Sequence, residues 1–245
     1  MNLKGKVAVI TGAAVGIGKG CALKFAQSGA DLALVDLNRE KLEAVKAELA
    51  AYPVKAEIYV CDVSDEDAVN KTAENITADF GKVDILVNNA ALWRDFRSFL
   101  EAPTSMWRKM LDINVMGVVY FTRAFLGGMI ERKYGRVINV ASVAGVYGNA
   151  NMVHYSSTKA AVIAMTKALA KEVAKDNVLV NCVSPGSVSP SENGDVDYVE
   201  PSELCFMGRT GSDMENANLI CFLASDEASY ISAQNIQIDG CRKKQ

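Results

Sequence analysis

A glycine-rich segment between a strand-like run and a helix-like run is the feature that most restricts how this chain can fold. Thr11-Gly12-Ala13-Ala14-Val15-Gly16-Ile17-Gly18 follows the β-branched run 6–10 and precedes helical periodicity over residues 19–26. We expect Gly12 to permit a tight turn, Gly16 to let the backbone approach a phosphate, and Gly18 to let the helix pack closely. Free N–H groups at the positive end of a helix bind anions. The segment predicts strand, turn and helix around a pyrophosphate, with Gly12, Gly16, Ile17 and Gly18 as binding residues.

A carboxylate at the end of the next strand adds to this prediction. Asp36 closes the run Asp31-Leu32-Ala33-Leu34-Val35, at the distance of about 20 residues where an acid meets the adenosine ribose diol of a dinucleotide. Two negative charges about 4 Å apart, at an effective dielectric near 20, repel by roughly 4 kcal/mol. Asp36 therefore opposes a 2′-phosphate, and the predicted cofactor is NAD(H).

Tyr155 and Lys159 are four residues apart, a spacing that places both side chains on one face of a helix. A free tyrosine has a pKa of roughly 10, and bringing it to about 7 takes roughly 4 kcal/mol. A cation about 4 Å away supplies about that much. The pair predicts a general acid or base for reducing a carbonyl or oxidising an alcohol. The alternative is two unrelated residues on a solvated helix face.

Strand-like and helix-like runs alternate along the whole chain, which is typical of a parallel sheet covered by helices. The predicted strands lie near residues 6–11, 31–36, 56–61, 84–88, 135–141, 178–184 and 235–238. The predicted helices lie near 17–28, 39–50, 66–80, 104–132, 154–175 and 213–225. The expected fold is α/β: a Rossmann-type doubly wound fold with a seven-stranded parallel sheet and helices on both faces, forming one domain over 1–245. The irregular segment 187–206 follows the sixth strand, where such sheets bind ligands.

Composition limits the possible partners. The chain has 245 residues, 50% of them hydrophobic, and a formal charge of −3, so nucleic acid is not expected. The N-terminus leads directly into the first strand and no uncharged apolar stretch of 18 residues occurs, so neither a secretory signal nor a membrane span is expected. The predicted location is the cytoplasm. Six scattered cysteines and one histidine predict core-filling thiols and no metal site.

Taken together, these motifs resemble the single-domain branch of the short-chain dehydrogenase/reductase family, over Lys6 to Gly240. The resemblance also includes Asp62-Val63, Asn88-Asn89-Ala90, Asn114, Ser142, Pro185-Gly186 and Phe222-Leu223-Ala224-Ser225-Asp226. It implies a catalytic tetrad in which the Ser142 hydroxyl binds the substrate oxygen and Tyr155 passes the proton. Lys159 would bind the nicotinamide ribose and lower the tyrosine pKa, and Asn114 would anchor a water joined to the lysine.

The resemblance extends to the cofactor site. It implies that Asp62 meets the adenine amino group and that Val63 lies beside the ring, although Asp62-Val63-Ser64-Asp65 is also an ordinary helix N-cap. Family members that use NADP usually carry a basic residue where this chain has Val15 or Leu37, and Arg39 is expected to open the next helix instead. The remaining expected cofactor contacts are Asn89, Gly186, Val188 and Ser189.

Four departures from the family pattern are visible. The usual Asn-Asn-Ala-Gly ends in Ala91, which costs about 1 kcal/mol if that position needs φ > 0. The usual threonine after Pro185-Gly186 is missing: Pro190 falls there without a gap, and Ser189 with a one-residue deletion. Near the C-terminus Ser232-Ala233-Gln234 replaces Thr-Gly-Gln, and Asp239-Gly240-Cys241 replaces Asp-Gly-Gly.

The expected function is NAD(H)-dependent interconversion of a secondary alcohol and its ketone, with a small-molecule substrate that the sequence leaves open among polyols, hydroxysteroids, hydroxyacids and 3-oxoacyl thioesters. The alternative is a catalytically silent NAD(H)-binding sensor or scaffold. The resemblance makes 187–206 a substrate lid, whose acids either disfavour anionic substrates or are simply solvated; these are Glu192, Asp195, Asp197, Glu200 and Glu203. His154 either faces substrate or points away from it. Apolar runs in the two long helices, with the resemblance, imply a homotetramer or a homodimer, with Cys241 near the second contact.

Overall fold

The computed structural model describes residues 1–189 and 194–243. Part of the predicted lid, Pro190–Asn193 with Glu192, and the last two residues lie outside the described residues. The two described parts of the lid are treated below with the candidate site.

A seven-stranded parallel sheet forms the centre of the molecule, in the order β3-β2-β1-β4-β5-β6-β7. The order reverses between β1 and β4, and such a switch point is where doubly wound sheets bind ligands at the carboxyl ends of the strands. The predicted fold class is confirmed, and each strand lies within two residues of its predicted bounds. The strands are β1 (Val7–Thr11), β2 (Asp31–Asp36), β3 (Ala56–Val60), β4 (Ile85–Asn88), β5 (Gly135–Val140), β6 (Val178–Pro185) and β7 (Asn235–Ile238).

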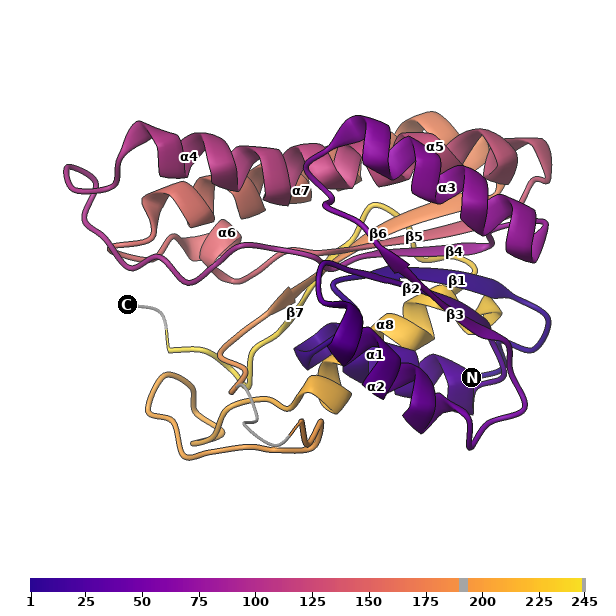
Figure 1. Cartoon of the computed structure of the whole chain (residues 1–245). Helices are drawn as coiled ribbons and strands as arrows, with labels where there is room; N and C mark the ends of the chain where they lie inside the picture. Colours follow the sequence, from indigo (N-terminus) through magenta and orange to yellow (C-terminus); the bar gives the residue numbers. More distant parts are fainter. Residues whose placement is uncertain (190–193, 244–245) are drawn as a thin grey trace.

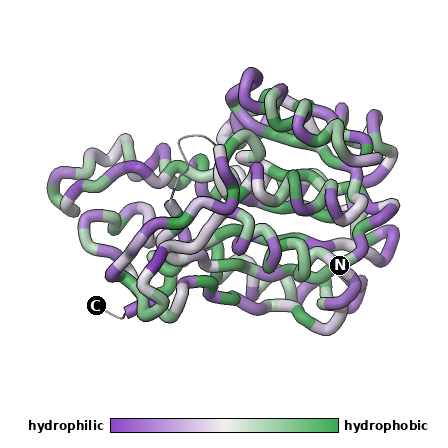
Figure 2. The backbone as a smooth tube through the Cα atoms, turned by 90° about the horizontal axis from the view of Figure 1, so that it is seen from below, coloured by the Kyte–Doolittle hydropathy of each residue, from purple (hydrophilic) through white to green (hydrophobic). Residues whose placement is uncertain are grey.

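Helices cover both faces of the sheet (Figure 1). One face carries α1 (Gly16–Gln27), α2 (Arg39–Leu49) and α8 (Asp213–Ala224). The other carries α3 (Glu66–Phe80), α4 (Thr104–Leu111), α5 (Gly117–Glu131) and α7 (Val153–Val173). In Figure 2 hydrophobic and hydrophilic positions alternate along the helices, as expected for helices with one face on the sheet and one in solvent.

The core has one main cluster on each side of the sheet. Phe25 of α1 belongs to the first cluster and Phe121 of α5 to the second, and both side chains are fully buried. Every residue of β1, β5 and β6 is buried. Because both faces of these strands are covered, their residues are mostly apolar on both faces rather than alternating apolar and polar.

The predicted helix 104–132 is interrupted at its centre. Between α4 and α5, residues Asp112–Met116 form a single π-helical turn, which carries Asn114. Such turns occur mostly at functional sites, and no periodicity in the sequence marks them. Together, Thr104–Glu131 is the one helix among the described residues that could cross a membrane by length and apolar composition alone. Since it packs against α3 and the sheet, it forms a layer of this fold.

Three further short elements were not expected. The four-residue helix α6 (Ala144–Tyr147) follows β5 and leads to α7. A 3-10 turn at Ala174–Asp176 ends α7, and another at Asp226–Ala228 follows α8. Helices this short have too few residues to show a period in the sequence.

The three positions where this chain lacks a glycine that is usual in the family do not all have the left-handed backbone that glycine favours. Ala91 is not among the non-glycine residues of positive φ in the described part of the chain, so it carries no left-handed strain. Ala233 and Cys241 have a left-handed backbone, with φ of 62° and 60°. Left-handed backbone costs a residue with a Cβ roughly 1–2 kcal/mol. The backbone strain caused by replacing glycine is therefore found at Ala233 and Cys241, near the C-terminus, and not at Ala91.

Candidate active site

The glycine segment is a tight loop that only glycines permit. Gly12 and Gly16 have φ of 66° and 60°. A Cβ on Gly18 would lie 2.0 Å from the carbonyl oxygen of Gly12. Gly18 is thus required by the loop itself, in addition to the helix packing that the sequence suggested. Helix α1 starts at Gly16 with no side-chain cap and no acid in its first turn, so its free N–H groups, including that of Ile17, suit a phosphate group.

Thr11 and Asn89 fasten this loop to the end of β4. The Asn89 side-chain amide donates to the carbonyl oxygens of Thr11 (3.0 Å) and Gly12 (3.1 Å). The Thr11 hydroxyl accepts from the backbone N–H groups of Asn89 (3.0 Å) and Ala90 (3.1 Å). Asn89 therefore shapes the cofactor loop by holding its backbone. Thr11 was missed as a site residue, although its place at the end of β1 beside the glycines was a usable signal.

Asp36 lies at the carboxyl end of β2, next to the glycine loop. Its carboxylate accepts from the backbone N–H groups of Ala14 (3.1 Å) and Asn38 (3.0 Å). Arg39 opens α2, as expected, and its guanidinium lies 3.7 Å from Glu43 on the same helix. At the two positions from which a basic side chain would bind a 2′-phosphate, this chain has the exposed side chains of Val15 and Leu37.

Asp62 and Val63 follow β3 on the same edge of the sheet. The N-cap of α3 is Asp65, whose side chain accepts from the N–H of Ala68. This leaves Asp62 outside the cap, with its carboxylate bonded to Ser64 through the hydroxyl (2.6 Å) and the backbone N–H (2.9 Å). Val63 is buried against the helix start at Gly117. The segment thus does supply the N-cap of α3, through Asp65, and the adenine contact of Asp62 stays a prediction.

Ser142, Tyr155 and Lys159 meet beyond the carboxyl end of β5. The Ser142 hydroxyl lies close enough to the Tyr155 phenol to lower its pKa, and the Lys159 ammonium lies 5.8 Å from the centre of the tyrosine ring. Lys159 is buried, and its Nζ donates to the carbonyl of Val140 at 2.8 Å. The fold thus brings Ser142, which follows β5, into a single cluster with Tyr155 and Lys159 of α7.

The pKa values in this cluster differ from the expectation. Burial raises the pKa of Tyr155 to about 12, with the Ser142 hydroxyl offsetting part of the rise. Burial lowers the pKa of Lys159 to about 8. The expectation that Lys159 lowers the phenol pKa toward neutrality is therefore not met, because the pKa of Tyr155 lies above its ordinary value. The physical reason is that desolvation acts on both groups, and the ammonium is directed at the Val140 carbonyl.

Asn114 completes the cluster from the π-helical turn. Its side chain is fully buried and bonds the backbone of Leu92 twice, accepting from the N–H (2.7 Å) and donating to the carbonyl (2.9 Å). It also donates to the Thr158 hydroxyl at 3.1 Å. The side chain thus joins the segment after β4 to the catalytic helix, and Thr158, next to Lys159, was not singled out from the sequence.

The residues directly after β6 mainly form contacts within the lid and with neighbouring segments. A Cβ on Gly186 would lie 2.8 Å from the Cα of Asp239, so glycine is needed for close chain contact. Val188 forms a parallel bridge with Gly211. Ser189 is buried, and its hydroxyl hydrogen-bonds the Glu200 carboxylate. The lid acid Glu200 is therefore hydrogen-bonded within the lid. That Ser189 takes the place of the usual threonine stays a prediction.

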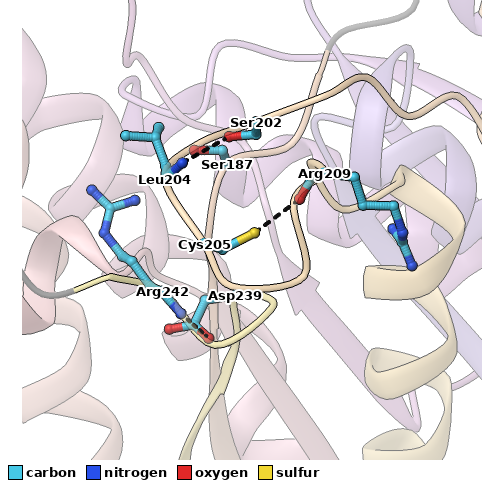
Figure 3. A pocket seen from close by; sticks show the side chains of 7 residues that line it. All are labelled: Ser187, Ser202, Leu204, Cys205, Arg209, Asp239 and Arg242. Carbon is cyan, nitrogen blue, oxygen red and sulfur yellow. Dashed lines mark hydrogen bonds between the residues drawn. The ribbon is translucent and has the colours of Figure 1, made fainter.

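The described parts of the lid are attached to neighbouring elements. Figure 3 shows Cys205 and Arg209 beside Asp239 and Arg242, in a small pocket where the lid meets the C-terminal segment. The N–H of Phe206 donates to the carbonyl of Cys241 at 2.9 Å. On the other side, the Lys19 ammonium of α1 donates to the carbonyl of Gly194 at 3.1 Å.

His154 lies in a buried position beside Trp107 and Asp95. It is 1% exposed, its ring lies 5.7 Å from that of Trp107, and its Nε2 is 3.8 Å from the Asp95 carboxylate. Among the two interpretations of His154, this geometry favours the one without a substrate contact. The cysteines are all free, five are buried and Cys241 is exposed, which confirms that most are core-filling thiols.

Comparison with known proteins agrees with this geometry. A family model described as short chain dehydrogenase matches residues 6–197. The 3-oxoacyl-[acyl-carrier-protein] reductase of Thermotoga maritima is 40% identical over 243 residues, covering 98% of both proteins. The 2-dehydro-3-deoxy-L-rhamnonate dehydrogenase (NAD(+)) of a Sphingomonas strain is 38% identical over 244 residues, covering 97% of this chain and 95% of that one. A crystal structure of NAD+-bound xylitol dehydrogenase superposes with a TM-score of 0.90 at 34% identity, covering 98% of this chain and 100% of that chain.

Proposed function

The chain belongs to the short-chain dehydrogenase family and is an oxidoreductase acting on alcohol and ketone groups, and from this premise we propose that it uses NAD(H) on a secondary alcohol or its ketone. The observation that carries the proposal is the cluster of Ser142, Tyr155 and the buried Lys159, which lies beyond the sheet edge that also holds the glycine loop. When bound there, the nicotinamide supplies or accepts the hydride.

The protein's own groups handle the substrate oxygen and its proton. The Ser142 hydroxyl orients the oxygen, and the Tyr155 phenol transfers the proton. With a pKa of about 12, the phenol is protonated at neutral pH, the form that donates to a carbonyl. Asn114 acts as a positioning residue, since its side chain is taken up by Leu92 and Thr158.

The preference for NAD(H) over NADP(H) rests on the surroundings of Asp36. The carboxylate lies at the end of β2, and no basic side chain occupies Val15 or Leu37. Two relatives whose names mention NAD+, the rhamnonate dehydrogenase and the xylitol dehydrogenase, support the same choice. Asp62 and Val63 supply the adenine contacts in this proposal, and Gly186, Val188 and Ser189 lie toward the nicotinamide.

Fluorescence titration tests the cofactor assignment. NADH should bind at least tenfold more tightly than NADPH, which is about 1.4 kcal/mol, and Asp36→Ala should narrow that gap. Asp31→Ala is the matched control, because Asp31 lies at the opposite end of the same strand, where it accepts from the N–H of Lys55. Equal dissociation constants for the two cofactors in the unchanged protein would refute the role of Asp36.

The catalytic role is tested by deleting the one transferable proton. Tyr155→Phe should retain the fold and NADH affinity and lose most turnover on any alcohol or ketone that the unchanged protein converts. Tyr59→Phe removes another phenol, bonded to Asp79 of α3 beside the edge strand β3, and should leave turnover unchanged. Near-normal turnover in Tyr155→Phe contradicts the mechanism, and NADH binding without turnover on a broad substrate panel favours the sensor.

Assembly, lid and location complete the proposal. We propose a homotetramer, or a homodimer through α5 and α7, because only 39% of the most apolar stretch of Thr104–Glu131 is buried within one chain. The whole chain acts as one catalytic unit with 187–206 as its lid. The free thiols suit the reducing cytoplasm. Light scattering at micromolar concentration checks the assembly, and a mass of 26.3 kDa would identify a monomer.

A further inference from the structure

A buried carboxylate lies beside the predicted phosphate site and has no role in the function proposed above. Asp213 is the first residue of α8, and α8 packs along α1. Its Oδ1 is 3.7 Å from the position of a Cβ on Gly16, the first residue of α1. The carbonyl oxygen of Asp213 is 3.1 Å from the same position on Gly20, one turn further along. The carboxylate therefore borders the first turn of the helix that would hold the pyrophosphate.

Asp213 has no cationic side chain as a partner in the part of the chain that the structure describes. It is 6% exposed and forms no ion pair among the residues that the structure describes. From α1, the facing group is the Cys21 thiol, whose pKa is raised by burial and by the charges of Cys221 and Asp213. Lys19 is engaged with Glu48 and the carbonyl of Gly194.

On α8 itself, the nearby acid is already paired. Glu215 binds the guanidinium of Arg209 at 2.7 and 2.9 Å. Burial alone raises the pKa of Asp213 to about 6. Near neutral pH this carboxylate can therefore exist in either form, and a small change in its surroundings decides which form predominates.

We propose that Asp213 is a further residue of the cofactor site, and that it takes up a proton when a pyrophosphate binds at the start of α1. The inference rests on the proposed function, because it requires that site to hold a dinucleotide. A pyrophosphate brings negative charge beside the carboxylate, and like charges favour the neutral acid. Cofactor affinity should consequently fall as pH rises through the range in which Asp213 ionises.

The magnitude follows from linkage. If binding shifts the protonation midpoint by about one pH unit, affinity differs about tenfold between the acidic and the alkaline limits. At pH 6.5 such a shift corresponds to an uptake of about half a proton on binding. Both quantities are measurable without knowing the substrate.

The experiment is calorimetric titration with ADP-ribose from pH 5 to 7.5, in buffers of two ionisation enthalpies. ADP-ribose carries the pyrophosphate but no nicotinamide, so it avoids the ionisation of Lys159 near pH 8. The unchanged protein should bind about tenfold more weakly at pH 7.5 than at pH 5 and take up protons. Asp213→Asn should bind with nearly constant affinity, more tightly than the unchanged protein at pH 7.5, and with no proton uptake.

Controls separate this inference from the proposed function. Asp67→Asn makes the same change in the first turn of α3 and should retain the pH dependence, and adenosine, which has no phosphate, should show none. Asp213→Ala, with circular dichroism to verify folding, serves if the asparagine variant does not fold. A pH dependence that persists in both Asp213 variants overturns the inference while leaving the cofactor site intact. Absence of ADP-ribose and NADH binding at every pH overturns the site and the inference together.

Discussion

Replacing the buried catalytic lysine should stabilise the protein while removing its function. Lys159 is 3% exposed, and burial lowers its pKa from 10.5 to about 8. At 1.36 kcal/mol per pKa unit, holding this charge in the fold at pH 7 costs about 3 kcal/mol. Lys159→Met removes that cost and loses the hydrogen bond to Val140, worth about 1 kcal/mol. The expected net gain at pH 7 is about 2 kcal/mol.

The sign of the pH dependence follows from proton counts. Between pH 8 and 10.5 the unfolded chain keeps the lysine proton that the folded chain has released, so unfolding free energy rises with pH in this window. The advantage of Lys159→Met should therefore shrink to near zero by about pH 9.5. Urea unfolding at the two pH values measures both quantities. Because other groups titrate in both proteins, the difference between variant and unchanged protein is the quantity to compare.

Lys171→Met is the matched control. Lys171 lies in the last turn of the same helix and is exposed, so its substitution should change the unfolding free energy little at either pH. A Lys159→Met protein that is less stable than the unchanged chain at pH 7 would refute the reasoning. So would a stability difference that stays constant between pH 7 and 9.5.

Two backbone predictions accompany this one. Gly18→Ala places a Cβ 2.0 Å from the Gly12 carbonyl oxygen, so NADH affinity should fall at least tenfold, about 1.4 kcal/mol; an unchanged dissociation constant by fluorescence titration contradicts the loop geometry. Cys241→Gly relieves a left-handed residue with φ of 60° and should stabilise the chain by about 0.5 kcal/mol. Ala91→Gly, at a position without positive φ, should instead destabilise it by about 1 kcal/mol. Urea unfolding of both variants checks the opposite signs, and equal signs contradict the assignment of strain.

The sequence by itself predicted the seven strands and the longer helices of this protein, and it singled out the residues that are proposed to carry its chemistry. Glycines at 12, 16 and 18, and the spacing of Tyr155 and Lys159, are local patterns whose meaning depends on a few neighbouring residues. The apolar runs indicated the strands because a strand covered on both faces is mostly apolar. These patterns can be recognised in the sequence without knowing which distant segments are in contact.

Only the tertiary structure decided how these residues behave. The low pKa of Lys159, the high pKa of Tyr155 and the approach of Asp213 to Gly16 all depend on segments far apart in the chain. The left-handed backbone at Ala233 and Cys241 and the π-helical turn at Asn114 have the same origin. Burial, electrostatic surroundings and backbone strain are properties of packed neighbours, and a linear pattern of residue types does not specify which neighbours those are.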